Sequence, residues 1–197
     1  MTAVGTLLSF SGGVIVGQLV VFADRGLQLP KGDARIGLLY TAWSAGGVIG
    51  SIILHRARRT TDAVSVLVIT LPVTTGLAAL VALAGSWPIA MTLILLWAAA
   101  YAVILVNTMT YSQSVTPPAM QGRVNTMRRM ISSGLGVPLG SFVGALVTSS
   151  SNVRTGMSLS ALAVGLATVL VLVARTRGLC PRPQRPDELL PRPPAGG

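Results

Sequence analysis

Charged residues are scarce in this sequence. Of its 197 residues, 10% are charged and 51% are apolar, whereas a soluble domain carries about 25% charged residues. Each of the longest uncharged stretches is about as long as a bilayer-spanning helix of roughly 20 residues, or longer. These stretches are Met1–Ala23, Ile36–Leu54, Ala63–Gly122, Met130–Val153 and Thr155–Ala174. The composition excludes an ordinary soluble domain and predicts an all-α membrane protein.

Cysteine, histidine and acidic residues are also few. The chain has one cysteine, Cys180, one histidine, and five acidic residues. A single cysteine excludes an intrachain disulfide and leaves a cysteine-based metal site without a partner. The apolar spans contain neither a nucleophile with a base nor a carboxylate pair, one of which an intramembrane hydrolase requires. We therefore expect a protein that is not an enzyme and that uses no metal or other cofactor.

Six spans fit the apolar windows, and Gly85-Ser86-Trp87-Pro88 supplies the turn that divides the longest one. We expect residues 1–177 to form one six-helix transmembrane bundle. Residues 178–197, rich in Pro and Arg, are expected to form a disordered cytoplasmic tail. The predicted helices are Thr2–Phe22, Ile36–Leu54, Ala63–Ala84, Pro88–Gln113, Asn125–Ser149 and Thr155–Ala174.

Basic residues predict the orientation, because short loops rich in Lys and Arg normally stay in the cytoplasm. Eleven of the fifteen follow the second, fourth or sixth predicted helix, and Arg25, Lys31, Arg35 and Arg154 lie on the other side. An even number of spans then places both termini in the cytoplasm of a multi-pass cell-membrane protein. This division among short loops also argues against nucleic acid as a partner. The excess of Arg over Lys, with abundant Ala and Gly, indicates a bacterial source.

The predicted helices differ in polarity in a repeated order. The third and sixth are plain Val, Leu and Ala segments, and the other four carry most of the Gly, Ser, Gln, Tyr and Trp. Plain helices suit lipid contact, and helices with small or polar residues suit helix contacts or a cavity. The order polar, polar, plain occurs twice, which predicts a three-plus-three repeat of the kind found in transporter halves.

Glycines at four-residue spacing mark expected helix contacts. Such spacing lets two helix backbones approach closely, and a glycine ridge containing a proline also suits a helix that bends during a conformational cycle. Both static packing and gating therefore remain open for these positions. The candidates are Gly46 and Gly50 in the second helix, and Gly136, Pro138, Gly140 and Gly144 in the fifth.

A few polar and aromatic side chains are candidates for lining a substrate cavity. Helical geometry places Trp97, Tyr101, Thr108 and Tyr111 on one face of the fourth helix. Aromatic faces with a few hydrogen-bonding groups suit large, partly apolar ligands, although Tyr111 also fits an interfacial aromatic belt. The cavity candidates are Ser11, Gln18, Trp43, Trp97, Tyr101 and Thr108.

The loop before the fifth helix carries a family resemblance. Gly122-Arg123-Val124 followed by Pro138-Leu139-Gly140 resembles exporters of the major facilitator superfamily, in the branch of macrolide-efflux and enterobactin-exporter proteins. Phe22-Ala23-Asp24-Arg25-Gly26-Leu27 and Gly46-Gly47-Val48-Ile49-Gly50 also look like that branch. The resemblance implies that these helices form the C-terminal half of a major facilitator fold. It further implies that Arg123, Arg56 and Arg59 brace the cytoplasmic side. The loop after the second helix, which carries Arg56 and Arg59, resembles the superfamily's basic inter-helix motif without its usual acidic residue.

The function implied is efflux of lipophilic drugs or metabolites by proton antiport, when this half is joined to an N-terminal half. Family transporters have two six-helix halves around a midplane cavity, and this chain supplies one. The expected partners are the lipid bilayer, a small-molecule substrate, and an N-terminal half or a second copy. The alternatives are an autonomous dimeric six-helix channel or permease, with dimerisation through the Gly136–Gly144 ridge, and a non-transporting membrane scaffold.

Overall fold

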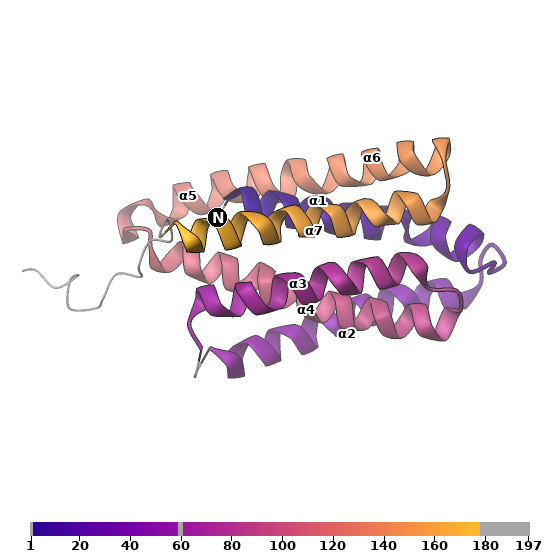
Figure 1. The fold of residues 1–197 in the computed structure, drawn as a ribbon, viewed down its shortest axis with the longest axis horizontal. Helices are drawn as coiled ribbons and strands as arrows, with labels where there is room; N and C mark the ends of the chain where they lie inside the picture. The colour runs from indigo at the N-terminus through magenta and orange to yellow at the C-terminus, as the bar shows by residue number, and fades with distance from the viewer. Residues whose placement is uncertain (1, 59–60, 178–197) are drawn as a thin grey trace, which may run out of the picture.

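Six long helices run along the same axis in a computed structural model that describes residues 2–58 and 61–177 (Figure 1). All six are long and apolar enough to cross a membrane. The chain is therefore an all-α, multi-pass membrane protein, as the sequence predicts. Cys180 and the expected tail at 178–197 lie outside the described residues.

The helix bounds agree with the predicted ones to within a few residues, except before the fifth predicted helix. This span becomes helical at Gln121, before the predicted start at Asn125. Both this span and the first also contain a π-helical segment that the sequence did not predict. The elements are α1 (Thr2–Val21), η1 (Phe22–Gly26), α2 (Ala34–Ala57), α3 (Ala63–Leu83), α4 (Trp87–Ser114), η2 (Pro118–Met120), α5 (Gln121–Arg129), η3 (Met130–Leu135), α6 (Gly136–Ser150) and α7 (Val153–Thr176).

Three helices begin at residues whose side chains cap them. Asp33 Oδ1 accepts a hydrogen bond from Arg35 N at 2.8 Å at the start of α2. Asp62 Oδ2 accepts one from Ser65 N at 3.0 Å at the start of α3. Asn152 Oδ1 does the same for the backbone N–H of α7 at 2.8 Å. Asp and Asn are favoured here because their oxygens satisfy backbone donors that the first turn leaves unpaired.

Removing the cap of α3 is expected to loosen its first turn. Asp62→Ala loses the bond to Ser65, and such caps contribute about 1 kcal/mol. Hydrogen bonds from Ser65 lower the pKa of the Asp62 carboxyl below 3.8. The stabilisation is therefore present above about pH 4 and lost as the pH falls through the lower folded value. Amide hydrogen exchange should be faster in the variant at pH 7 than in the wild type, and this difference should shrink toward pH 3; equal exchange at pH 7 would contradict the capping role.

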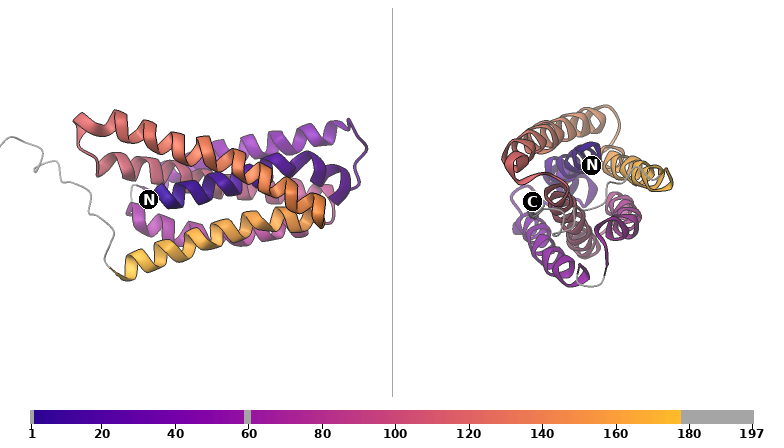
Figure 2. Two further views of the ribbon diagram at one scale, coloured as in Figure 1. Left: turned by 90° about the horizontal axis from the view of Figure 1, so that it is seen from above. Right: turned by 90° about the vertical axis from the view of Figure 1, so that its left-hand side faces the viewer.

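The long helices pack in an order that is symmetric between the two halves of the sequence. The largest helix contacts follow the order α2, α4, α3, α7, α1, α6; in addition α6 touches α7, whereas α2 and α3 have no comparable contact. Exchanging α1 with α4, α2 with α6 and α3 with α7 leaves this order of neighbours unchanged. Figure 1 shows α6, α1 and α7 in its upper half and α3, α4 and α2 below, and Figure 2 shows the helices end-on. This symmetry is the arrangement expected of a three-plus-three repeat.

The distribution of exposed surface differs from the expected one. In the apolar windows of α2 and of the span from Gln121 to Ser150, 22% of residues are buried, against 39% in α3, 33% in α7 and 61% in α1. The polar second and fifth spans, and not the plain third and sixth, are thus the most exposed. The reason is their position, because α2 and α6 stand at the two ends of the packing order. Sequence polarity alone does not specify that position.

Candidate substrate groove and helix contacts

A groove of about 230 Å³ lies between α2 and α4. It contains two of the predicted cavity residues, Trp43 and Tyr101. Small side chains at Gly47 and Ala98 leave the space open, and Leu105 supplies an apolar wall. The complete lining is Trp43, Ser44, Gly47, Ala98, Tyr101, Ala102 and Leu105. An aromatic, mainly apolar groove with few polar groups suits a lipophilic ligand.

Tyr101 connects this groove to the interior of the bundle. Its ring lies 5.1 Å from the ring of Trp97, at an interplanar angle of 33°. Its hydroxyl points toward α1, where a Cβ added to Gly12 would stand 2.7 Å from it. Trp97 is fully buried, and its Nε1 has no hydrogen-bond partner. Trp97 therefore lies behind the groove, in the core, while Tyr101 reaches both.

The other three cavity candidates lie in buried helix contacts. Ser11 Oγ is 2.6 Å from Ser160 Oγ, which joins α1 to α7. Gln18 Oε1 accepts a hydrogen bond from Thr148 Oγ1 at 2.9 Å, which joins α1 to α6. Thr108 Oγ1 donates to the carbonyl of Ile104 within α4, at 2.6 Å. The structure does not place these side chains on the groove, because each polar group is turned toward a protein partner.

The Gln18–Thr148 bond is expected to contribute modestly to stability. Hydrogen bonds between membrane helices contribute about 0.6 kcal/mol on average. A double-mutant cycle with Gln18→Leu and Thr148→Val, measured by unfolding in mixed micelles, should give a coupling of that size. Ser149→Ala provides the control, because Ser149 is exposed and bonds only within its own helix. A coupling near zero would mean that the two side chains are not bonded in the membrane.

The predicted glycine ridges lie at the two closest helix contacts. A Cβ at Gly46 would overlap the carbonyl of Leu95, and one at Gly50 would overlap the carbonyl of Ala99, so α2 lies directly on α4. A Cβ at Gly140 would likewise overlap the carbonyl of Phe10 in α1.

The neighbours of Gly140 on its ridge pack on α1 as well. A Cβ at Gly136 would stand 2.8 Å from Ser9 Cβ, and one at Gly144 would stand 3.3 Å from Gln18 Nε2. The ridge from Gly136 to Gly144 is therefore occupied within the chain. A dimer formed through it, as the alternative of a dimeric channel or permease expects, would have to displace α1.

Pro138 lies just after the π-helical segment η3, on the exposed side of α6. Proline cannot donate to the carbonyl four residues earlier and its ring crowds that carbonyl. That residue is Gly134, which is inside η3 (Met130–Leu135). The wider turn of a π-helix gives the ring room, and π-helical turns are frequent at functional sites. If α5 and α6 bend relative to each other, we expect the bend to occur at this segment.

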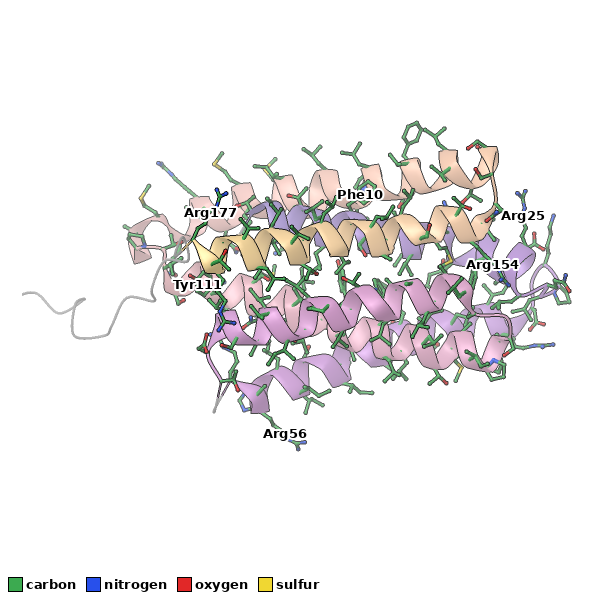
Figure 3. The ribbon with its side chains drawn as sticks, in the orientation of Figure 1. Phe10, Arg25, Arg56, Tyr111, Arg154 and Arg177 are labelled. Carbon is green, nitrogen blue, oxygen red and sulfur yellow. The ribbon has the colours of Figure 1, made fainter. Side chains whose placement is uncertain are left out.

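The basic side chains predicted to brace one end of the bundle are mostly exposed. Arg56 and Arg123 are exposed, and Figure 3 shows Arg56 extending away from the helices. Arg59 lies outside the described residues. The arginine that contacts a neighbouring helix is Arg128, 8% exposed, whose Nη1 donates to the carbonyl of Thr108 at 3.0 Å. Arg128 lies inside the predicted helix Asn125–Ser149 and in α5 of the structure, but the sequence assigned the bracing role only to Arg56, Arg59 and Arg123.

A signal for Arg128 was present in the spacing of the ridge. Continuing the four-residue steps back from Gly136 reaches Ser132 and Arg128, and both are buried. Ser132 Oγ donates to the carbonyl of Arg128 at 2.6 Å. Arg128 Nε has no partner, so part of this guanidinium is buried without compensation. Asn107, which is not among the predicted cavity residues, is also buried, and its Nδ2 donates a hydrogen bond to the carbonyl of Ala63 at 2.7 Å.

The described residues contain no group of three or more His, Cys, Asp or Glu side chains placed to hold a metal ion. An apolar groove of about 520 Å³ lies between α2, α3 and α4, beside Ile69 and Val73, and none of the predicted cavity residues lines it. The groove at Tyr101 thus remains the best candidate for a substrate contact. Comparison with family models, curated proteins and solved structures finds no match to this chain.

Proposed function

We propose that this chain is one six-helix half of a secondary transporter of the major facilitator type, which exports lipophilic drugs or metabolites by proton antiport. The observation that carries the proposal is the exchange-symmetric packing order of the six helices. An inverted repeat of three helices is the building unit of such halves. The resemblance at Gly122-Arg123-Val124 and Pro138-Leu139-Gly140 supports the same assignment.

The exposed surface of α2 and α6 supports the requirement for a second half. These helices stand at the ends of the packing order, and they carry small and polar side chains that lipid contact does not require. Ser44 and Ser51 are exposed on α2, as is Ser133 before α6. A second six-helix unit placed against this side would enclose the groove at Trp43 and Tyr101. The coupling acid of the antiport is then expected in the other half, because the spans here lack carboxylates.

The orientation is part of this proposal. Arg56 and Arg177 lie at one end of the bundle, and Arg25 and Arg154 lie at the other (Figure 3). The end with more basic residues also holds the start of α1 and the end of α7. The rule that basic loops stay inside assigns that end to the cytoplasm of the cell membrane.

A reconstitution experiment tests the proposed function. The chain alone in proteoliposomes is expected to show no extrusion of a lipophilic dye driven by a proton gradient. Joined to an N-terminal six-helix half, it should extrude the dye, and Tyr101→Ala should reduce the rate about tenfold by removing one anchor from the groove. Leu162→Ala is the matched control, because Leu162 is exposed on α7 away from the groove. Extrusion by this chain alone, in a sample shown by crosslinking to be monomeric, would contradict the half-transporter assignment. If the joined halves extrude no dye, the proposal of transport is contradicted.

The alternative of an autonomous dimeric channel or permease requires a different dimer contact from the one first considered. The Gly136–Gly144 ridge already packs on α1. A dimer would therefore need another contact, such as the exposed side of α2 and α6. Crosslinking from Val48→Cys in a Cys180→Ser background, followed by sizing of the product, tests this alternative. A product of twice the mass of this chain indicates a second copy, and a product that also contains another chain indicates a different six-helix half.

A further inference from the structure

A cavity of about 670 Å³ opens at the end of the bundle opposite the N-terminus of α1. It lies between the segment after α1, the end of α3 and the start of α7. Its volume falls within the range of ordinary small-molecule sites, about 300–1,000 Å³. The lining residues are Arg25, Gly26, Gln28, Ala79, Ala82, Leu83, Asn152, Val153, Arg154, Thr155 and Ser158.

The cavity combines positive charge with an apolar wall. Arg25 and Arg154 both line it, and Figure 3 shows them at the same end of the molecule. No lining residue is acidic, and neither arginine forms an ion pair within the part of the chain that the structure describes. Arg35 at the same end differs, because it pairs with Asp33 at 3.1 Å. Two exposed arginines without an ion-pair partner in the described part of the chain therefore line one cavity.

Backbone hydrogen bonds hold the segment that carries Arg25. Leu27 N donates to the carbonyl of Phe22 at 3.0 Å, and Leu29 N donates to the carbonyl of Ala23 at 2.9 Å. Gln28 between them has a φ of 55°, in the left-handed region that non-glycine residues seldom adopt. Such strained positions persist only where their surroundings fix them, and they cluster at ligand sites. The loop is thus a defined wall of the cavity.

The opposite wall comes from α7 and α3. The positive end of the α7 dipole, at Val153, adds to the potential of Arg154 beside it. The apolar part of the lining is Ala79, Ala82 and Leu83 of α3, a helix apolar enough to cross the bilayer. An anionic group held by the arginines would therefore have an apolar surface next to it, leading toward the hydrocarbon region.

We propose that this cavity binds the phosphate headgroup of an anionic phospholipid, with Arg25 and Arg154 beside the phosphate and the acyl chains along α3. A lipid headgroup and a free phosphate ion would both present a phosphate group to the two arginines. The apolar wall and the position at the end of the spans select the lipid. In the orientation proposed above, the lipid comes from the outer leaflet, although the binding chemistry does not depend on transport.

Thermal unfolding of the purified full chain in non-ionic detergent tests this site. Short-chain phosphatidylglycerol, short-chain phosphatidylcholine and inorganic phosphate are titrated separately, and the midpoint of the stabilisation is measured. Phosphatidylglycerol is expected to stabilise at concentrations about 25-fold below phosphatidylcholine, because each of the two arginines near an anionic headgroup contributes about a fivefold gain in affinity. Inorganic phosphate should not stabilise at those concentrations.

Variants assign the effect to the cavity. Arg25→Gln with Arg154→Gln should raise the phosphatidylglycerol midpoint more than about tenfold, and each single change about fivefold. Lys31→Gln removes the same charge at the same end but outside the lining, and should leave the midpoint unchanged. An unchanged midpoint in both single variants would overturn the site, whether or not the double variant folds. Equal stabilisation by both lipids in the wild type, or by inorganic phosphate, would overturn the assignment to an anionic lipid.

Discussion

Replacing Gly140 with leucine is expected to separate α6 from α1 and to prevent the native bundle from forming. A Cβ at this position would overlap the carbonyl of Phe10, which is backbone and cannot rotate away. Overpacking commonly costs about 1–3 kcal/mol even where side chains yield, and a side chain pressed against the backbone of a neighbouring helix is expected to exceed that range. We expect the apparent melting temperature in detergent to fall by more than roughly 10 °C, since about 1 kcal/mol corresponds to 2–4 °C at this size.

Gly76→Leu is the matched control for that experiment. Gly76 is also a helical glycine in an apolar span, but nothing lies within 4 Å of a Cβ placed there. Leucine is a better helix former than glycine by nearly 1 kcal/mol, so this variant should be as stable as the wild type or more so. Size-exclusion chromatography after heating should show aggregation of the Gly140 variant alone. A monodisperse Gly140→Leu protein with unchanged melting temperature would mean that α1 and α6 are farther apart than described.

Replacing Arg128 with methionine is expected to leave the bundle as stable as before, or to stabilise it by about 1–2 kcal/mol. Arg128 is 8% exposed, its Nε has no partner, and Nη1 is bonded only to the carbonyl of Thr108. A buried charge without a counter-ion costs free energy, and an apolar side chain of similar length does not. The melting temperature should therefore stay constant or rise by roughly 3–6 °C.

Transport should respond in the opposite direction. Arg128 links α5 to α4 two residues before η3, where the α-helical hydrogen bonding changes to π-helical. If α5 bends relative to α6 at η3 during the transport cycle, the contact from Arg128 to α4 would form in one state and break in another. In the joined transporter, Arg128→Met is expected to lower dye extrusion at least about tenfold while the protein remains folded, a trade-off common at functional positions.

The neighbouring arginine separates this effect from a general loss of charge. Arg129 is exposed, so Arg129→Met should change neither melting temperature nor transport appreciably. A drop of several degrees for Arg128→Met would show that the arginine is a structural residue. Full transport by a folded Arg128→Met protein would show that its bond to Thr108 plays no part in the cycle.

The sequence predicted the helices well for a simple physical reason. A backbone inside a bilayer must satisfy its own hydrogen bonds, so an apolar stretch of sufficient length has to be helical. Length and charge therefore placed the six spans, and capping residues such as Asp62 and Asn152 mark where two of them begin. The two π-helical segments were not predicted, because a register change in one helix leaves no composition signal.

The candidate site was predicted only in part. Trp43 and Tyr101 line the groove, whereas Trp97 shares the helix face of Tyr101 but lies in the core. Helical geometry tells which residues share a face, and it does not tell whether that face meets a neighbouring helix or open space. The same ambiguity concealed the burial of Arg128, although its four-residue spacing from Ser132 and Gly136 matched the buried ridge.

The sequence by itself determined that this is an all-α protein with six helices suited to a membrane, because transfer of peptide groups and charges into hydrocarbon is too costly for other arrangements. It also marked the glycines at which helices approach closely. Only the tertiary structure decided which helices are neighbours, and hence that α2 and α6 stand exposed at the ends of the packing order. That choice depends on how side chains from distant segments fit together, and a pattern along one helix does not contain it.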